Sequence, residues 1–356
     1  MIPPNPLLGT ALHGIGAAFA ALCYTPQKRV SRWSWQSYWL VQALFCWMLL
    51  PIIGAWLTIP ELGKVLSEAP RGAMLASFAL GAAYGIGGTA FGVSIRYVGF
   101  SLTYAIAIGL STVLGTLIPP LVAGTLGMTL SKPGANWVIG GMVVGMVGIA
   151  LTGAAGRMKE RDLTATSNLG GFSLAKGLLL SLIAGVLSAV YGFALAAGEP
   201  IADAATKHGA GVFRGNVVYI FSNTGAFLTT AIYCLWLHRK HKTLGEIVEL
   251  PAGAEGASLP VNWTMAVLTG CLWYGQFFFY NLGHVRMGEY KFTSWAIHMI
   301  MLILFSIVVG WLFHEWRGSR RRTSLSVGVA FLVLVGAVLA LTYGNHLAEI
   351  APAHGS

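Results

Sequence analysis

Hydrophobic residues gather in runs of about 20, separated by short polar segments. A run of that length, wound as an α-helix, crosses the roughly 30 Å hydrocarbon layer of a bilayer. The runs lack the ten-residue alternation of an outer-membrane barrel, so the pattern predicts an all-α membrane protein. Breaks at proline, glycine and charged residues give ten expected transmembrane helices: 7–25, 36–58, 73–95, 99–123, 135–155, 174–198, 213–237, 262–283, 293–313 and 324–344.

Composition agrees with this pattern, because 56% of the 356 residues are hydrophobic and only 10% are charged, against about a quarter charged in soluble domains. The first run has no basic segment before it and no small-residue cleavage site after it, so we expect a retained span and not a signal peptide.

Basic residues are distributed unevenly between the loops. Fifteen of the 22 Lys and Arg residues fall in the odd-numbered loops, which the positive-inside rule places in the cytoplasm. Both termini are then expected on the outer side. This topology accounts for the net charge of +10, so nucleic acid is not an expected partner.

The signatures of enzyme and metal sites are missing from the sequence. The four cysteines stand singly, with no CxxC pair or Cys/His cluster. No nucleophile elbow, HExxH motif, phosphate loop or pair of carboxylates occurs. We therefore expect no catalytic residues, no metal and no cofactor, and interpret the glycines of residues 85–92 as sites of close helix packing.

A weak internal repeat links the third and eighth runs. Tyr84-Gly85 precedes Arg96 by the same spacing with which Tyr274-Gly275 precedes Arg286. The sequence thus favours a duplication of five spans, with a first repeat over 1–156, a cytoplasmic linker over 157–173 and a second repeat over 174–356. Because five is odd, the repeats would be inverted, with a solute site between them near the midplane. Chance similarity among glycine-rich helices is the alternative.

The eighth run contains the segment WYGQFFFYNLGH, residues 273–284. On a helix, Trp273, Gln276 and Tyr280 share one stripe, and Tyr274 and Asn281 lie on the next. An unpartnered amide in hydrocarbon costs several kcal/mol, so Gln276 should face protein or a watery cavity. Sugars suit this combination, since hydroxyls bind amides and the C–H face of a pyranose packs on aromatic rings. Hydrogen bonding between helices is the alternative.

Two histidines lie well inside expected spans: His13 in the first, and His298 in the ninth, one turn after Trp295. Histidine exchanges protons near neutral pH, and ionisable groups inside a membrane are often functional. We expect His13 and His298 to couple transport to protons. The alternative is a neutral core histidine bonded to a carbonyl.

Several blocks carry a family resemblance: HGIGAAFAALCYTPQKRVSRWSW (residues 13–35), YGIGG, IRYVGFSL, WYGQFFFYNLGHVR and SWAIHM. Together they resemble the L-rhamnose/proton symporter family of the drug/metabolite transporter superfamily, over nearly the whole chain. The resemblance implies the drug/metabolite transporter fold, with ten helices in a 5+5 inverted repeat. It also implies proton-coupled uptake of a 6-deoxyhexose across a bacterial inner membrane, so the outward-facing termini expected from the loop charges would be periplasmic. His13, Gln276, Tyr280 and His298 match its motif residues.

Three positions depart from the family pattern. This chain has Gly88 where the family has asparagine, Tyr104 where it has a small residue, and Lys291 where it has an acid. Because such changes alter the recognition of hydroxyl groups, L-fucose is an alternative to L-rhamnose. An exporter of drugs or metabolites, and a receptor without turnover, are further alternatives. The expected substrate-binding residues are Trp273, Gln276, Tyr280, Tyr274, Asn281, Trp295 and Tyr84, and the expected partners are a neutral sugar, a proton and the lipid bilayer, with no obligatory protein partner.

Overall fold

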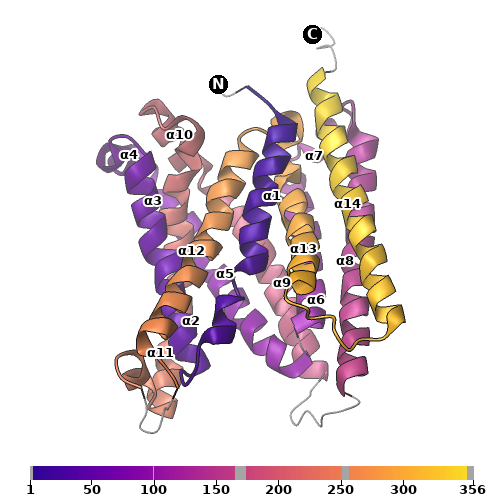
Figure 1. The fold of residues 1–356 in the computed structure, drawn as a ribbon. Helices are drawn as coiled ribbons and strands as arrows, with labels where there is room; N and C mark the ends of the chain where they lie inside the picture. The colour runs from indigo at the N-terminus through magenta and orange to yellow at the C-terminus, as the bar shows by residue number, and fades with distance from the viewer. Residues whose placement is uncertain (1–2, 99, 165–173, 251–255, 351–356) are drawn as a thin grey trace. The chain divides into compact units, whose positions relative to one another are not determined.

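The computed structural model describes residues 3–98, 100–164, 174–250 and 256–350, and within them every regular element is a helix (Figure 1). The helices, in order, are α1 Pro6–Leu22, η1 Pro26–Arg29, α2 Trp35–Ala43, η2 Leu44–Leu49, α3 Leu50–Thr58, α4 Leu62–Glu68, α5 Arg71–Val98, α6 Phe100–Val122, α7 Leu126–Leu130, α8 Ala135–Thr164, α9 Leu174–Ala197, α10 Glu199–Lys207, η3 Gly211–Val217, α11 Val218–His241, η4 Leu244–Ile247, α12 Leu259–His284, η5 Gly288–Thr293, α13 Ser294–Leu312 and α14 Arg321–Ile350. The all-α prediction is confirmed for these residues.

Each of the ten hydrophobic runs overlaps a long helix or a series of consecutive helices. In the described part of the chain, nine helical segments are long and apolar enough to cross a membrane. The eighth run forms α12, which has 26 residues and is not among the nine. Its Trp, Tyr, Gln, Asn and His residues lower its mean hydropathy, so the segment expected to bind sugar is less apolar than those nine.

The chain divides into two compact units. The first unit comprises Met1–Ala21, Gly87–Gly192 and Phe279–Ser356, and the second comprises Leu22–Ile86 and Phe193–Phe278. Each unit therefore takes residues from both expected repeats, and α5, α9 and α12 contribute to both units. Of the expected linker, 157–164 continues α8, and 165–173 lies outside the described residues.

The first unit is built around a core that contains Ile297, Ile300, Leu334 and Leu341, all fully buried. Its helices α8 and α14 run side by side (Figure 1). Their backbones come close at Gly141, where an added Cβ would lie 2.8 Å from the Leu341 side chain. Small residues commonly permit such close packing inside membranes.

The second unit holds α5 against α11 through a glycine crossing. A Cβ added at Gly81 would lie 1.9 Å from the carbonyl oxygen of Ser222, and one added at Gly225 would lie 2.1 Å from that of Phe78. Since these neighbours are backbone atoms, a side chain at either position would push the helices apart. A Cβ added at Gly85 would lie 2.5 Å from the carbonyl oxygen of Ala226. The packing role expected of this glycine is therefore confirmed.

The second expected span is a helix with an irregular middle. A π-helical turn, η2, separates α2 from α3, and Pro51 follows it as the second residue of α3. Proline has no N–H to offer the carbonyl four residues before it, and its ring crowds that carbonyl. A wider turn relieves this crowding, and such turns often occur at functional sites. The carbonyl in question belongs to Trp47.

The connector after α11 is tied to the start of α2 through η4. The Glu246 carboxylate accepts hydrogen bonds from the Ser34 N–H at 2.7 Å and the Ser37 hydroxyl at 2.9 Å. The Trp33 indole N–H donates to the Glu246 carbonyl at 2.6 Å. A carboxylate at a helix N-terminus satisfies backbone donors there and opposes the helix dipole, so this part of the connector is anchored. Residues 251–255 lie outside the described ones.

Candidate functional site

The expected site residues fall into two groups, one in each compact unit. The first unit contains His13 on α1, Tyr280 and Asn281 at the end of α12, and Trp295 and His298 on α13. The second unit contains Tyr84 on α5 and Trp273, Tyr274 and Gln276 on α12. We name His13, Tyr280, Trp295 and His298 the histidine cluster. We name Trp47, Tyr84 and Trp273 the tryptophan cluster.

Tyr280 is the centre of the histidine cluster. Its ring centroid lies 5.1 Å from that of His13, 5.4 Å from that of His298 and 5.8 Å from that of Trp295. The half-buried His284, one turn later on α12, stacks on Tyr280 at 5.6 Å with 14° between the planes. The two imidazoles of His13 and His298 are 6.0 Å apart. Three helices thus bring the two expected proton-coupling histidines onto one tyrosine ring.

His13 is fully buried, and neither of its ring nitrogens has a hydrogen-bond partner among the described residues. His298, also fully buried, hydrogen-bonds to the backbone of His13. The α12 backbone approaches closely here, since a Cβ added at Gly283 would lie 3.1 Å from the His13 ring. A core histidine bonded to a carbonyl accounts for His298 but leaves His13 unexplained. Buried polar groups usually find a partner, so His13 is the stronger proton-site candidate.

Trp295 is held by α6. Its indole N–H donates to the Ser111 carbonyl at 3.0 Å, and a Cβ added at Gly115 would lie 2.6 Å from the indole nitrogen. The ring also lies 6.2 Å from that of Tyr191. Because its donor is already engaged, Trp295 can offer a ligand its aromatic face but not its N–H.

The tryptophan cluster consists of three rings in mutual contact. The centroid of Trp273 lies 5.1 Å from that of Trp47 and 6.3 Å from that of Tyr84, and Trp47 and Tyr84 are 6.0 Å apart. Trp47 was not expected from the sequence pattern. A tryptophan one turn before a proline inside a span is the signal that could have indicated it.

The remaining candidates on α12 are buried as well. Gln276 is 4% exposed and Asn281 is 6% exposed, so neither amide faces lipid. The ring of Tyr274 lies 6.4 Å from that of Tyr219. Its hydroxyl has no hydrogen-bond partner among the described residues, and it fits against Gly54, where an added Cβ would lie 2.1 Å away.

Tyr104, one of the departures from the family pattern, belongs to the hydrophobic core of the first unit. Its ring is 8% exposed and meets Phe91 at 5.5 Å with 65° between the planes. Core packing therefore accounts for at least its ring.

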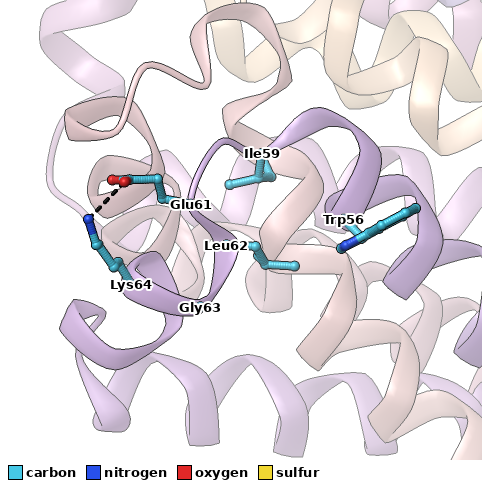
Figure 2. Close-up of a pocket in the computed structure, with 6 residues that line it drawn as sticks. All are labelled: Trp56, Ile59, Glu61, Leu62, Gly63 and Lys64. Atoms are coloured by element: carbon cyan, nitrogen blue, oxygen red, sulfur yellow. Dashed lines mark hydrogen bonds and ion pairs between the residues drawn. The ribbon is translucent and has the colours of Figure 1, made fainter.

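A surface pocket of about 490 Å³ lies in the second unit, after α3. Figure 2 shows its lining, with the Glu61 carboxylate paired to the Lys64 ammonium at 2.7 Å. The pocket is lined by Trp56, Ile59, Glu61, Leu62, Gly63 and Lys64, and none of these is an expected site residue. Within the described residues, no group of three or more His, Cys, Asp or Glu side chains could hold a metal ion.

Apolar helices long enough to span a bilayer, with histidines, amides and stacked rings buried inside them, define a multi-pass membrane protein of the transporter class. Comparison with known proteins gives the family. Residues 5–345 match the family of L-rhamnose-proton symport proteins (RhaT), and the chain belongs to this family. The resemblance stated from the sequence blocks is confirmed.

Curated relatives align along almost their entire length. The chain is 33% identical over 345 residues to an L-rhamnose-proton symporter of Mannheimia succiniciproducens, covering 95% of this chain and 98% of the relative. It is 33% identical over 338 residues to one of Cronobacter sakazakii, covering 94% and 97%. It is 32% identical over 342 residues to one of Shigella dysenteriae serotype 1, covering 95% and 98%.

Proposed function

We propose that this protein takes up L-rhamnose together with a proton, by alternating access across a bacterial inner membrane. The observation that carries the proposal is the match of residues 5–345 to the L-rhamnose-proton symport family. Relatives named as L-rhamnose-proton symporters support it. The buried imidazole of His13, whose ring nitrogens have no hydrogen-bond partner among the described residues, supports the coupling to protons independently.

The sugar is bound by rings and amides of α12 and its neighbours. Trp273 and Tyr84 offer aromatic faces to the C–H surface of the pyranose. Trp295, whose donor is engaged, contributes a face only. The polar groups that bond the sugar hydroxyls are those of Gln276, Tyr280, Tyr274 and Asn281.

The coupled proton is carried by His13, with His298 as the second carrier. An imidazole that lacks partners in the neutral form can take up a proton and release it without breaking hydrogen bonds. One elementary charge moved through 100 mV gives about 2.3 kcal/mol, which corresponds to roughly fifty-fold accumulation of a neutral sugar. Coupling to one proton is therefore sufficient for useful uptake.

The two compact units support the inverted repeat of ten spans. The boundary between units falls in α5 one residue after Tyr84-Gly85, and in α12 three residues after Tyr274-Gly275. The two helices that the repeat aligns are thus divided at similar points. We infer five spans in each of 1–156 and 174–356, with α12 as the eighth span. The charge asymmetry of the loops supports periplasmic termini.

L-Fucose is the second candidate substrate, because Gly88 replaces an amide of the family pattern and Lys291 replaces an acid. The two sugars differ in hydroxyl stereochemistry, and these replacements change which groups can hydrogen-bond to the hydroxyls.

The test uses the purified full chain in proteoliposomes. L-Rhamnose added outside should evoke an inward current and make the external medium more alkaline, because a proton enters with each sugar. L-Fucose, run in parallel, ranks the two candidates. Electroneutral sugar entry that does not depend on pH would refute proton coupling. A response to organic cations or amino acids and to no monosaccharide would instead favour an exporter.

A further inference from the structure

Trp47 contacts two residues that the proposed function assigns to the sugar, Trp273 and Tyr84. Its ring meets Trp273 with 85° between the planes and Tyr84 with 74°. The residue is 2% exposed. Trp47 thus brings an indole N–H into a group of rings whose faces suit the apolar face of a sugar.

That N–H has no hydrogen-bond partner among the described residues. A buried donor without an acceptor costs free energy and calls for an explanation. Two other indoles of this chain donate to backbone carbonyls: the N–H of Trp263 donates to Ile247 at 2.9 Å, and that of Trp295 donates to Ser111 at 3.0 Å. The indole N–H groups of Trp39 and Trp316 lack a partner among the described residues, as that of Trp47 does. Of these three tryptophans, Trp47 is the one that belongs to the tryptophan cluster.

The backbone at Trp47 is irregular as well. Trp47 lies in the π-helical turn η2, and Pro51 offers no N–H to its carbonyl. The wider turn changes the direction in which residues of η2 project, compared with a continuous α-helix. Irregular turns of this kind recur at functional sites, so the geometry of the main chain and the unused donor coincide at one residue.

We propose that Trp47 is a sugar-binding residue whose indole N–H donates to a hydroxyl or ring oxygen of a neutral monosaccharide. The inference rests on the proposed function and adds a residue to it. The chemistry fits this ligand class, because an indole N–H donates only. A sugar oxygen can accept its hydrogen bond, whereas the positively charged nitrogen of an organic cation cannot. Since the three rings touch one another, the sugar parts Trp47 from Trp273 on entry.

The decisive variant is Trp47→Phe, which keeps an aromatic ring and deletes the donor. Trp39→Phe is the matched control. Trp39 is also buried, its N–H also lacks a partner, and it lies earlier in the same span. It stacks on Trp35 at 5.0 Å and Tyr24 at 6.1 Å, outside the tryptophan cluster. Trp47→Tyr, which moves the donor instead of deleting it, provides a second variant.

Dissociation constants for L-rhamnose and its monodeoxy analogues are measured on the purified full chain by thermal stabilisation. Loss of one hydrogen bond raises the dissociation constant about three- to tenfold in Trp47→Phe, while Trp39→Phe stays within twofold of wild type. One monodeoxy sugar should bind wild type and Trp47→Phe equally, because it lacks the partner hydroxyl.

Unchanged L-rhamnose affinity in Trp47→Phe would overturn the role of Trp47 and leave the proposed function standing. Equal weakening in Trp39→Phe would also overturn it, since the effect would then not be local to the cluster. Absence of stabilisation of the wild-type protein by any monosaccharide would overturn both the role of Trp47 and the proposed function.

Discussion

The ring centroids of His13 and Tyr280 lie 5.1 Å apart, with 57° between the planes. This contact joins α1 to the C-terminal end of α12, and so places a candidate proton carrier against a candidate sugar ligand. Binding of the sugar hydroxyl by Tyr280 would alter the environment of His13 directly. The contact gives the proposed coupling a short physical path inside one compact unit.

Replacement of His13 by Gln should separate sugar exchange from proton-driven accumulation. Glutamine is similar in size but does not titrate, so accumulation at 100 mV should fall from about fifty-fold towards equality. Exchange of labelled for unlabelled sugar should persist, because it requires no net proton movement. Both are measured in proteoliposomes, with His314→Gln, at an exposed position, as control. Accumulation that survives in the His13 variant would remove this residue from the coupling step.

Gln276 should contribute affinity without being essential for folding. Gln276→Ala removes a buried amide, and we expect roughly tenfold weaker binding of the preferred sugar from one lost hydrogen bond to a hydroxyl. Isothermal calorimetry or thermal stabilisation measures the change, and circular dichroism checks that the helices are retained. An unchanged affinity would exclude Gln276 from the site and leave it as a contact between helices.

His208 should make stability depend on pH. Its Nε2 lies 2.9 Å from Glu68 and its Nδ1 lies 3.1 Å from Glu61, and these hydrogen bonds raise the pKa of His208 above its ordinary value. Hydrogen bonds from Lys64 and then His208 lower the pKa of Glu61. A raised histidine pKa adds stability at pH values below the unfolded pKa of about 6.5. That contribution disappears as the pH rises through the folded pKa.

The measurement is the thermal midpoint between pH 6 and pH 9, for wild type and His208→Gln. The wild-type midpoint should fall more steeply with rising pH than that of the variant, and the effect should shrink in high salt because the groups are partly exposed. Lys64, Lys207 and Asp203 are the other charged groups nearby in sequence on these elements. Parallel curves would show that Glu61 and Glu68 do not raise the pKa of His208 in the folded protein.

A side chain at Gly81 should destabilise the protein at the crossing of α5 and α11. Gly81→Ala places a Cβ against the carbonyl oxygen of Ser222, a backbone atom that cannot rotate away. We expect destabilisation of about 1–3 kcal/mol. Gly72→Ala, in the same helix with no atom within 4 Å of the added Cβ, should be neutral or stabilising by up to about 1 kcal/mol. Thermal unfolding of both purified variants compares them, and equal midpoints would contradict the crossing.

The sequence by itself determined where the helices lie. The boundaries of α9 and α13 follow hydrophobic runs closely, because the requirement that backbone groups be hydrogen-bonded in hydrocarbon turns any long apolar run into a helix. The polarity of Gln276 and the burial of His13 were also predictable, since a titratable or amide group in a span has few other places to go.

Tertiary structure decided what those groups meet. Hydropathy averages over a window. It does not show that Pro51 widens the turn carrying Trp47, that Ser111 occupies the donor of Trp295, or that the ring nitrogens of His13 have no hydrogen-bond partner in the described part of the chain. These outcomes depend on residues up to 184 positions apart, whose contacts are fixed by helix packing. Local sequence determines the length and polarity of each helix, whereas the direction of each side chain is set by the neighbouring helix against which it is buried.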